Sequence, residues 1–248
     1  MRCEDARLAR LPTRIGTLDC ASSLENSHVK ARPLRSSWIL LGTAAVIAAG
    51  LLGGRALADA SVPTESNSAQ EVVERLHAEL IIVMKSAKEL GYSGRFERLE
   101  PVVDAVFDTP FMAQKSIGRH WKTIAEEEKD RLLATFGQYT VANYAGRFDG
   151  YSGEAFETRG EEPSSHGTSL VRTVLILPKD DDVQLDYRLR PVGDGWKIID
   201  VYLDGTVSEL ALRRSQYSSL IRREGLEALI TALEEKMKNL SRGDDSVL

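Results

Sequence analysis

Cysteine is almost absent from this 248-residue sequence, whose only two, Cys3 and Cys20, lie near the N-terminus. A protein that loses this N-terminal segment keeps no thiol, so disulfides, thiolate metal sites and a cysteine nucleophile are excluded together. The remaining chain of about 190 residues must be held together by burial of apolar side chains. That length is sufficient for one ordinary core.

Long hydrophobic runs are also lacking, with one exception at residues 38–52, which are fifteen uncharged and mostly apolar positions. A helix of that length spans roughly 22 Å, less than the roughly 30 Å of a bilayer core. Lys30, Arg32 and Arg35 precede the run and an Ala-Leu-Ala sequence ends at Ala58, which is the order of a secretory signal with its cleavage site. We therefore predict that residues 1–58 are a signal peptide with a long n-region, cleaved after Ala58.

A surplus of positive charge is missing as well. The whole chain has a net charge of −5, and without the eight basic and four acidic residues of 1–58 it keeps 24 basic and 33 acidic side chains, a net charge of −9. Such a field repels phosphate polyanions, which makes nucleic acid an unsuitable partner. Charge-driven attachment to anionic lipid headgroups is disfavoured for the same reason.

The spacing of apolar residues predicts one α+β domain over 59–248, with flexible ends at 59–67 and 241–248. Helical spacing is present before residue 154 and after residue 205, and strand-like alternation lies between them. Short connections make the strands antiparallel neighbours, so we expect several helices packed on a curved antiparallel sheet of about four strands, enclosing a hydrophobic pocket. The expected strands are 154–159, 169–177, 183–190 and 195–203.

Helix signals set the expected helix ends. A capping box at Ser68 begins a first helix that we expect to end at Gly91, and a shorter helix covers 95–107. Thr109-Pro110 begins another, and a second capping box at Thr123 opens a helix to about Arg147. Two more helices are expected over 208–223 and 226–240.

Catalytic and metal-binding patterns are scarce. The three histidines after residue 58 lie in different expected elements and have no recognised metal spacing, and no phosphate loop, dinucleotide fingerprint or nucleophile elbow is present. The acidic clusters 126–128 and 180–182 suit a helix N-terminus and a turn. We predict no enzyme activity, no metal and no cofactor.

Four arginines in the penultimate helix do not form one basic patch, because Arg213 and Arg222 point to opposite sides of an ideal helix. We expect solvated arginines here, with one of them paired to a strand carboxylate. The hypothesis for that pair is Asp200 with Arg214.

The ordered segments of residues 107–230 resemble the MlaC or toluene-tolerance family of periplasmic lipid-binding proteins. The resemblance covers essentially all of 69–240. It is carried by Phe107-Asp108, Phe111-Met-Ala113, Gly118-Arg-His-Trp121, Phe136 to Tyr144, Val183-Gln-Leu-Asp-Tyr187, Gly195-Trp-Lys-Ile-Ile-Asp200, Asp204-Gly205, Arg214-Ser-Gln-Tyr217 and Glu224-Gly225.

The segment Ser208-Glu-Leu-Ala-Leu-Arg-Arg-Ser-Gln-Tyr217 is more similar to the hopanoid-associated HpnM branch than to MlaC itself. The resemblance implies a periplasmic carrier in a Gram-negative bacterium that moves a hopanoid between the inner and outer membranes. An alternative is a phospholipid carrier that serves an ABC transport system. The resemblance also implies an inner-membrane ABC or RND-type transporter and an outer-membrane lipoprotein complex as partners.

Strand alternation and helix stripes nominate the residues that line or support the pocket. A lipid of roughly 30 methylenes costs on the order of 24 kcal/mol to expose to water, so its carrier must enclose the tails. Rival hypotheses are a small periplasmic enzyme with a cone-shaped pocket and an interaction module of the envelope. The predicted pocket residues are Val83, Met84, Val106, Phe107, Phe136, Tyr139, Leu185, Tyr187, Leu189, Trp196, Ile198 and Leu220.

Overall fold

The computed structural model describes residues 68–243, which fall within one structural unit. The predicted signal peptide and cleavage site, and residues 59–67 and 244–248, lie outside the described residues. Within this range no helix is long and apolar enough to cross a membrane. The elements in chain order are α1 (Ala69–Lys85), α2 (Ala87–Val106), α3 (Thr109–Ile117), η1 (Gly118–Lys122), α4 (Glu126–Arg147), β1 (Ala155–Ser164), η2 (Ser165–Gly167), β2 (Thr168–Ile176), β3 (Val183–Val192), β4 (Gly195–Leu203), β5 (Val207–Ser208), α5 (Glu209–Glu224) and α6 (Leu226–Arg242).

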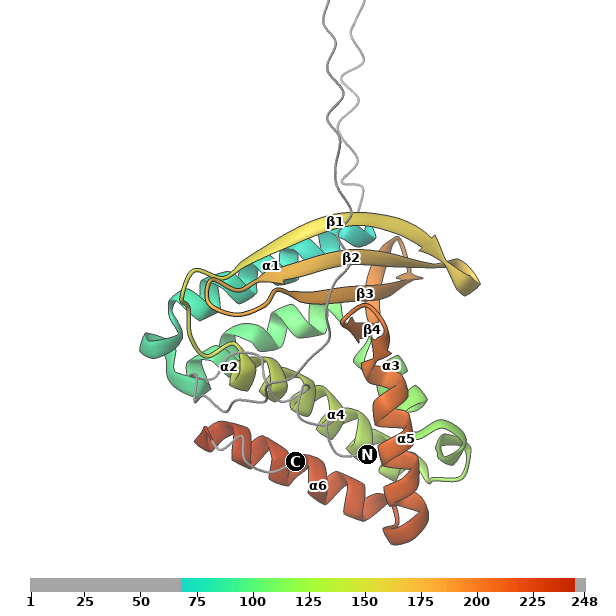
Figure 1. The fold of residues 1–248 in the computed structure, drawn as a ribbon. Helices are drawn as coiled ribbons and strands as arrows, with labels where there is room; N and C mark the ends of the chain where they lie inside the picture. The colour runs from blue at the N-terminus through green and yellow to red at the C-terminus, as the bar shows by residue number, and fades with distance from the viewer. Residues whose placement is uncertain (1–67, 244–248) are drawn as a thin grey trace, which may run out of the picture. The chain divides into compact units, whose positions relative to one another are not determined.

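The strands form a single antiparallel meander in the order β1-β2-β3-β4-β5. This confirms the predicted α+β class and its antiparallel sheet, with two differences. The two-residue strand β5 is an addition to the four expected strands, and β1 runs on to Ser164 across a bulge between Thr158 and Gly160. A second register shift lies between Arg188 and Leu189 of β3. Bulges bend and twist a strand, which accounts for the curvature of the sheet in Figure 1.

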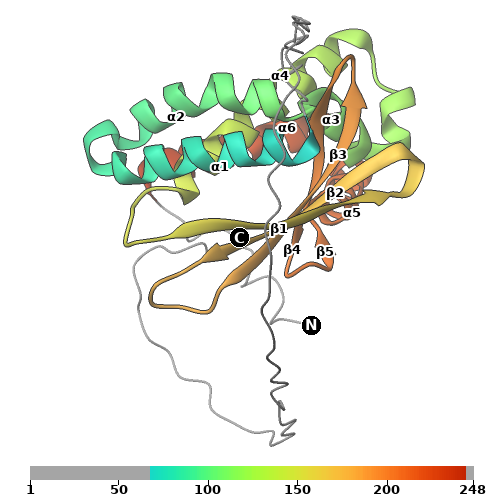
Figure 2. The ribbon, with the colours of Figure 1, turned by 90° about the horizontal axis from the view of Figure 1, so that it is seen from above.

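The helices cover one face of this sheet in successive layers (Figure 1). Helix α1 packs on β1, β2 and β4, α2 lies beside α1, and α4 packs between α2 and α6. Figure 2 shows α1 and α2 side by side over the sheet. Helix α5 leaves the sheet after β5 and crosses to α6, and it contacts α3 on the way. One face of the sheet is therefore buried beneath helices that come from both ends of the chain.

Two helix starts differ in how well their capping patterns predicted them. Ser68 caps α1 as expected, because its Oγ accepts from the Glu71 amide at 3.1 Å while the Glu71 carboxylate accepts from the Ser68 amide at 2.9 Å. The prediction that Thr123 caps the start of α4 is wrong. Helix α4 begins at Glu126 after Ala125, and Thr123 Oγ1 donates to the His120 carbonyl instead.

Gly91 interrupts the helical backbone as predicted, but the first helix has already ended before it. Helix α1 ends earlier, at Lys85, and α2 runs through Gly91 with a kink at φ 60°, ψ −175°. A side chain there would be strained, so glycine is the residue that this kink requires. The buried Arg95 supports the bend by donating Nε to the Ala145 carbonyl at 2.8 Å and Nη1 to the Ala87 carbonyl at 3.2 Å.

Gly146 allows α4 and α6 to approach each other closely. A Cβ atom at this position would lie 2.7 Å from Leu240 Cδ2, closer than carbon atoms pack. The apolar stripe of α6 that includes Leu229, Ile230 and Leu233 is buried. The last helix is thereby fixed against the core, and it continues to Arg242, past the predicted end at residue 240.

Strand β3 has one apolar face as expected, but not every residue on its opposite face is exposed to solvent. Leu185, Tyr187 and Leu189 are buried against the helices. Asp186 on the other face is also buried, with 1% of its surface exposed. Its carboxylate accepts from Arg172 Nη1 at 3.0 Å, from Gln184 Nε2 at 2.9 Å and from the Thr173 amide at 3.3 Å. A buried carboxylate is tolerated because these donors replace water.

His77 is a core residue of α1. Its ring stacks on Phe156 with centroids 3.9 Å apart, and its Nε2 lies 3.1 Å from the Tyr187 hydroxyl. Burial lowers the pKa of His77 to about 3, because the charged imidazolium would lose its hydration there. The folded protein thus keeps His77 neutral at every pH above that value.

Folding stability should consequently fall in acid. Below about pH 6.5 the unfolded chain binds a proton on His77 that the folded chain does not bind until about pH 3, so the free energy of unfolding decreases as pH falls through this window. Urea unfolding of the wild type and of His77→Gln at pH 7 and pH 5 checks this. We expect the wild type to lose about 2 kcal/mol more than the variant. Equal losses in both proteins would contradict it.

A candidate lipid-binding cavity between the sheet and the helices

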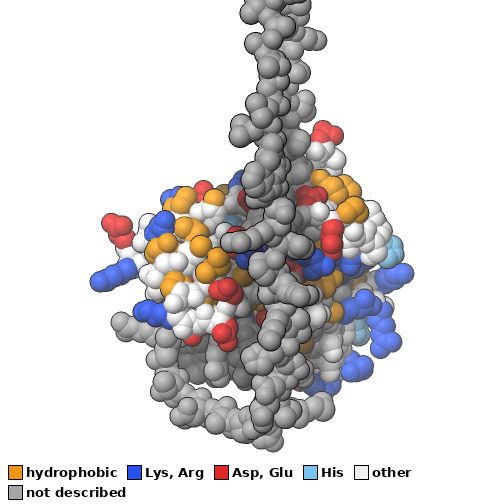
Figure 3. Space-filling view, turned by 45° about the horizontal axis from the view of Figure 1, so that its top comes forward, with side chains coloured by type: hydrophobic (Ala, Val, Ile, Leu, Met, Phe, Trp, Pro, Cys, Tyr) orange, Lys and Arg blue, Asp and Glu red, His pale blue; other side chains and the backbone are white. Residues whose placement is uncertain are grey.

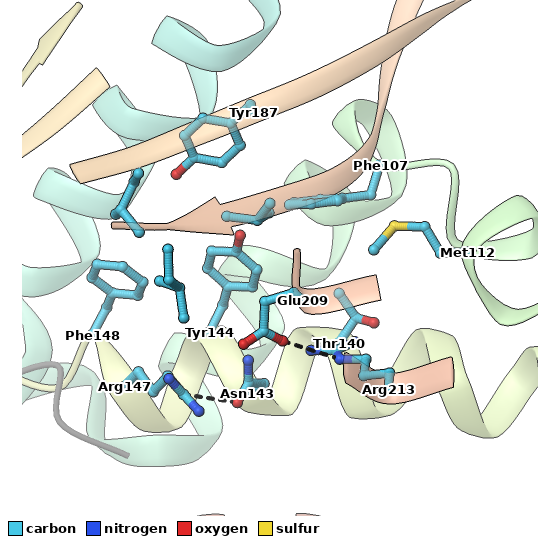
Figure 4. Close-up of a pocket in the computed structure, with 13 residues that line it drawn as sticks. Phe107, Met112, Thr140, Asn143, Tyr144, Arg147, Phe148, Tyr187, Glu209 and Arg213 are labelled. Atoms are coloured by element: carbon cyan, nitrogen blue, oxygen red, sulfur yellow. Dashed lines mark hydrogen bonds and ion pairs between the residues drawn. The ribbon is translucent and has the colours of Figure 1, made fainter. Parts of the chain in front are cut away.

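A cavity of about 70 Å³ lies between strands β3 and β4, the turn after α2, and the helices α3, α4 and α5. Its walls are mostly apolar or aromatic, and its polar side chains gather along α4 and α5 (Figure 4). The volume is well below the roughly 300–1,000 Å³ of a typical small-molecule site. The lining residues are Phe107, Met112, Thr140, Asn143, Tyr144, Arg147, Phe148, Leu185, Tyr187, Val201, Leu203, Glu209 and Arg213.

Phe107 enters the cavity because the chain is pinned to the sheet at this point. Phe107 forms a parallel bridge with Ile198 of β4, and the Asp108 amide donates to the Ile198 carbonyl at 2.9 Å. The Asp108 carboxylate caps α3 through the Phe111 amide at 3.1 Å and accepts from Arg190 Nε at 2.6 Å. The turn between α2 and α3 is thereby held on β4 with Phe107 facing inward.

Aromatic rings form a continuous row along the cavity. Tyr144 of α4 lies between Phe107 and Phe148, with centroids 5.4 Å and 5.8 Å away. Phe148 is 6.2 Å from Phe156, which stacks on His77. In Figure 4 Tyr144 points from α4 toward the strands that carry Tyr187. Such rings supply a large apolar surface with few rotatable bonds, a suitable wall for a hydrocarbon.

The polar end of the cavity contains an ion pair on one turn of α5. Arg213 Nε lies 3.2 Å from Glu209 Oε2, and only 12% of the arginine side chain and 20% of the glutamate side chain are exposed. Nearby on α4, Arg147 Nε donates to Asn143 Oδ1 at 2.9 Å (Figure 4). The cavity therefore has an apolar body and a polar end.

Arg213 is held among aromatic rings. Its guanidinium carbon lies 5.7 Å from the centroid of Phe136 and 5.6 Å from that of Tyr139, both within the range of a cation–π contact. Burial by itself lowers the pKa of Arg213, but Tyr217 and Glu209 outweigh that effect and raise it above the ordinary value. The guanidinium is therefore always charged, although it lies inside the protein.

Asp200 fixes the start of α5, and hence the position of Glu209 and Arg213. This buried carboxylate of β4 accepts from Ser208 Oγ at 2.6 Å, from the Leu210 amide at 3.0 Å and from the Val201 amide at 2.9 Å. Ser208 Oγ in turn accepts from the Ala211 amide at 2.9 Å and caps the helix. The first turn of α5 is thus bound directly to the sheet.

The expected Asp200–Arg214 pair is wrong, because Asp200 has no contact with that arginine and uses the start of α5 instead. The expectation of solvated arginines is also wrong at Arg213. At i and i+4 on one helix, Glu209 and Arg213 have the spacing of a helical ion pair, so the sequence contained the signal for their contact. It contained no signal that the pair is buried.

Three of the twelve predicted pocket residues line this cavity, namely Phe107, Leu185 and Tyr187. The other nine pack in or against the surrounding core. Six of them are buried and three partly buried: Val83, Met84, Val106, Phe136, Leu189 and Ile198, and Tyr139, Trp196 and Leu220. Alternation along a strand identifies the inward face but does not separate cavity wall from filled core.

Most of the wall came from residues that were not predicted. Tyr144 continues the apolar stripe of α4 and Phe148 lies four residues further, so the 3.6-residue period could have identified both. Val201 and Leu203 of β4 face the cavity because the register shift between residues 198 and 200 reverses the alternation that Ile198 begins. Thr140 lies on the same stripe of α4, four residues before Tyr144. Met112, Asn143, Arg147, Glu209 and Arg213 have no such signal, because only the packing of α3, α4 and α5 brings them together.

The arrangement is suited to binding rather than to proton transfer. Burial raises the pKa values of Tyr144 and Tyr187 above their ordinary value, so both hydroxyls stay protonated at neutral pH. Arg213 stays charged, and the ring of His77 stays neutral. No group of three or more potential metal ligands occurs among residues 68–243.

The class of protein is thus an α+β protein in which helices cover one face of an antiparallel meander, around a cavity with aromatic walls and a polar end. The model of the MlaC protein family matches residues 74–235. The chain belongs to the MlaC family, and the resemblance found in the sequence is confirmed at the level of the family. No curated protein sequence matches the chain.

A solved structure supports the fold. It is the phospholipid-binding protein from Ralstonia solanacearum in complex with a phospholipid, and it is 20% identical in sequence with a TM-score of 0.62. The match covers 70% of this chain and 99% of that protein. At this identity the similarity concerns the fold, and the helices and meander described above are therefore an arrangement that a natural phospholipid-binding protein also uses.

The role of Asp200 can be measured through stability. Asp200→Ala removes the acceptor of Ser208 Oγ and of two partly buried amides, so we expect a loss of about 2–4 kcal/mol in the free energy of unfolding. Urea unfolding at pH 7 measures it. Asp194→Ala, in the exposed turn between β3 and β4, is the control and should change stability by less than about 0.5 kcal/mol. A similar small effect at Asp200 would show that it does not anchor α5.

Proposed function

We propose that this protein is a periplasmic lipid carrier that encloses an apolar lipid in the cavity between sheet and helices and moves it between the inner and outer membranes. The observation that carries the proposal is the aromatic cavity beneath the meander, in a chain of the MlaC family. Exposing a lipid of roughly 30 methylenes to water costs on the order of 24 kcal/mol, so a shuttle between membranes needs such an enclosure.

Loading requires the cavity to widen. Its volume of about 70 Å³ has room for about two water molecules, whereas a bound lipid needs a site of several hundred cubic ångströms. The sheet is continuous and hydrogen-bonded, so the space comes from the helices moving away from it. Helix α5 contacts the sheet at its last strands, β4 and β5, and then continues away from the sheet to α6.

The ligand we propose is a hopanoid. The support is the segment from Ser208 to Tyr217, where the chain departs from the MlaC pattern toward the hopanoid-associated HpnM branch. Two residues of this segment, Glu209 and Arg213, line the cavity, so the departure falls on the ligand-facing side of α5. Delivery would involve an inner-membrane ABC or RND-type transporter and an outer-membrane lipoprotein complex.

A phospholipid is the second candidate ligand, with an ABC transport system as the partner. It is favoured by the shared fold of the Ralstonia solanacearum protein, which was solved with a bound phospholipid. Both candidates need the same apolar enclosure, and they differ in the polar end of the ligand.

Co-purifying lipid distinguishes these candidates. The full-length chain is expressed in a hopanoid-producing Gram-negative host, purified from the periplasm and extracted with organic solvent for mass spectrometry. We expect a polycyclic triterpenoid at about one molecule per protein. A phospholipid would replace the hopanoid assignment with the second candidate. Protein free of any lipid would contradict the carrier proposal.

A blocking substitution tests whether the cavity is the binding site. Leu203 of β4 lines the cavity and is partly exposed, so Leu203→Trp should fill the space while the fold is kept, and should lower lipid occupancy at least tenfold. Val207 pairs with Leu203 across β4 and β5 but is 45% exposed and outside the cavity, so Val207→Trp is the matched control. Equal occupancy in both variants would place the lipid elsewhere.

A further inference from the structure

Arg213 has an unused hydrogen-bond donor inside the protein. Its Nη1 exposes less than 1 Å² and has no hydrogen-bond partner, and among residues 68–243 it is the one buried side-chain nitrogen or oxygen with this property. A buried donor without an acceptor is costly, and native proteins rarely keep one without a functional reason. The atom belongs to a residue of the cavity wall (Figure 4).

The charge of Arg213 is already compensated. Glu209 lies 3.2 Å from its Nε, and the rings of Phe136 and Tyr139 face the guanidinium. An anion that approached Nη1 would also approach the Glu209 carboxylate, in surroundings of low polarity where repulsion is strong. An uncharged oxygen avoids this repulsion and still accepts the hydrogen bond. A hydroxyl group adds a donor that the neighbouring carboxylate can accept.

We propose that Glu209 and Arg213 form a recognition site for an uncharged, hydroxyl-bearing end of the carried lipid, in which Arg213 Nη1 donates to a lipid hydroxyl and Glu209 accepts from one. This inference rests on the proposed carrier function and specifies its ligand class. The lipid enters with its polar end toward α5 and its apolar body along the aromatic row. Nη1 becomes accessible when the cavity widens, because its residue Arg213 already belongs to the wall.

A purely structural role for the pair predicts a different outcome. Replacing both members of a buried ion pair by uncharged residues of similar size is often neutral or stabilising, since the desolvation of two charges is relieved. A pair retained for ligand recognition can therefore be removed without loss of stability but with loss of selectivity. A pair retained for the fold shows a lower Tm when it is removed.

The test compares two probes of the same acyl chain, 1-monooleoylglycerol and oleoyl lysophosphatidic acid. The first has an uncharged diol and the second has a phosphate at that end. Full-length protein exported to the periplasm is delipidated, and each probe displaces the uncharged dye N-phenyl-1-naphthylamine. The variants are Arg213→Met with Glu209→Gln, and the control Arg223→Met with Glu224→Gln, which removes an exposed pair from the same helix.

We expect the wild type and the control to prefer monooleoylglycerol by about ten- to a hundredfold, the range for a hydrogen bond to a charged group. The double variant at 209 and 213 should lose this preference, keep its affinity for the dye and unfold at the same or a higher Tm. Wild-type protein that binds the dye and both probes equally, or prefers the phosphate, would overturn the inference while the carrier function stands. Failure of the wild type to bind the dye and either probe would contradict the carrier function itself.

Discussion

The buried carboxylate of Asp200 is the contact on which the cavity depends. It stands near the middle of β4 and binds the first turn of α5 through Ser208 Oγ and the Leu210 amide. Ser208 lies eight positions after Asp200 in the sequence. This short span means that β4, the turn at Asp204-Gly205 and the start of α5 form one rigid corner. Burial raises the pKa of Asp200, while its three hydrogen bonds lower it. The carboxylate is thus costly to bury, but its hydrogen bonds fix the start of α5 on β4. This corner sets where α5 begins, and the contacts of this helix with α3 and α6 continue the placement of Glu209 and Arg213 at the cavity.

The same corner explains how one structure contains both an apolar wall and a buried charge. The aromatic row from Phe107 to Phe156 crosses the molecule from the end of α2 to the edge strand β1. Its rings give the cavity an apolar surface that does not fix the orientation of a ligand by hydrogen bonds. The Arg213–Glu209 pair adds direction at one end. An apolar wall alone would admit any hydrocarbon, so we assign the choice of ligand to the polar end.

The fold combines fixed and movable parts. The antiparallel meander is hydrogen-bonded along its length and is closed beneath α1 and α2, which supports a stable floor. Helices α5 and α6 contact the other helices more than the sheet, and they are joined at Gly225, whose φ of 88° favours glycine. The C-terminal pair of helices is therefore held to the sheet mainly through the first turn of α5, and otherwise by contacts with other helices.

The sequence alone determined the order of elements, the antiparallel sheet and the family. Period-two alternation in 183–190 and 195–203 and the stripes of the helices are local properties, which depend on neighbours a few residues apart. It also indicated Phe107, Leu185 and Tyr187 as inward residues. The alternation of β3 predicted that Asp186 is exposed, but hydrogen bonds from Arg172 and Gln184 allow it to be buried. The capping pattern at Thr123 failed because its hydroxyl donates to the His120 carbonyl. The burial of most of the Arg213 side chain follows from tertiary contacts, since Phe136 and Tyr139 of α4 lie against its guanidinium and no pattern within α5 records that contact.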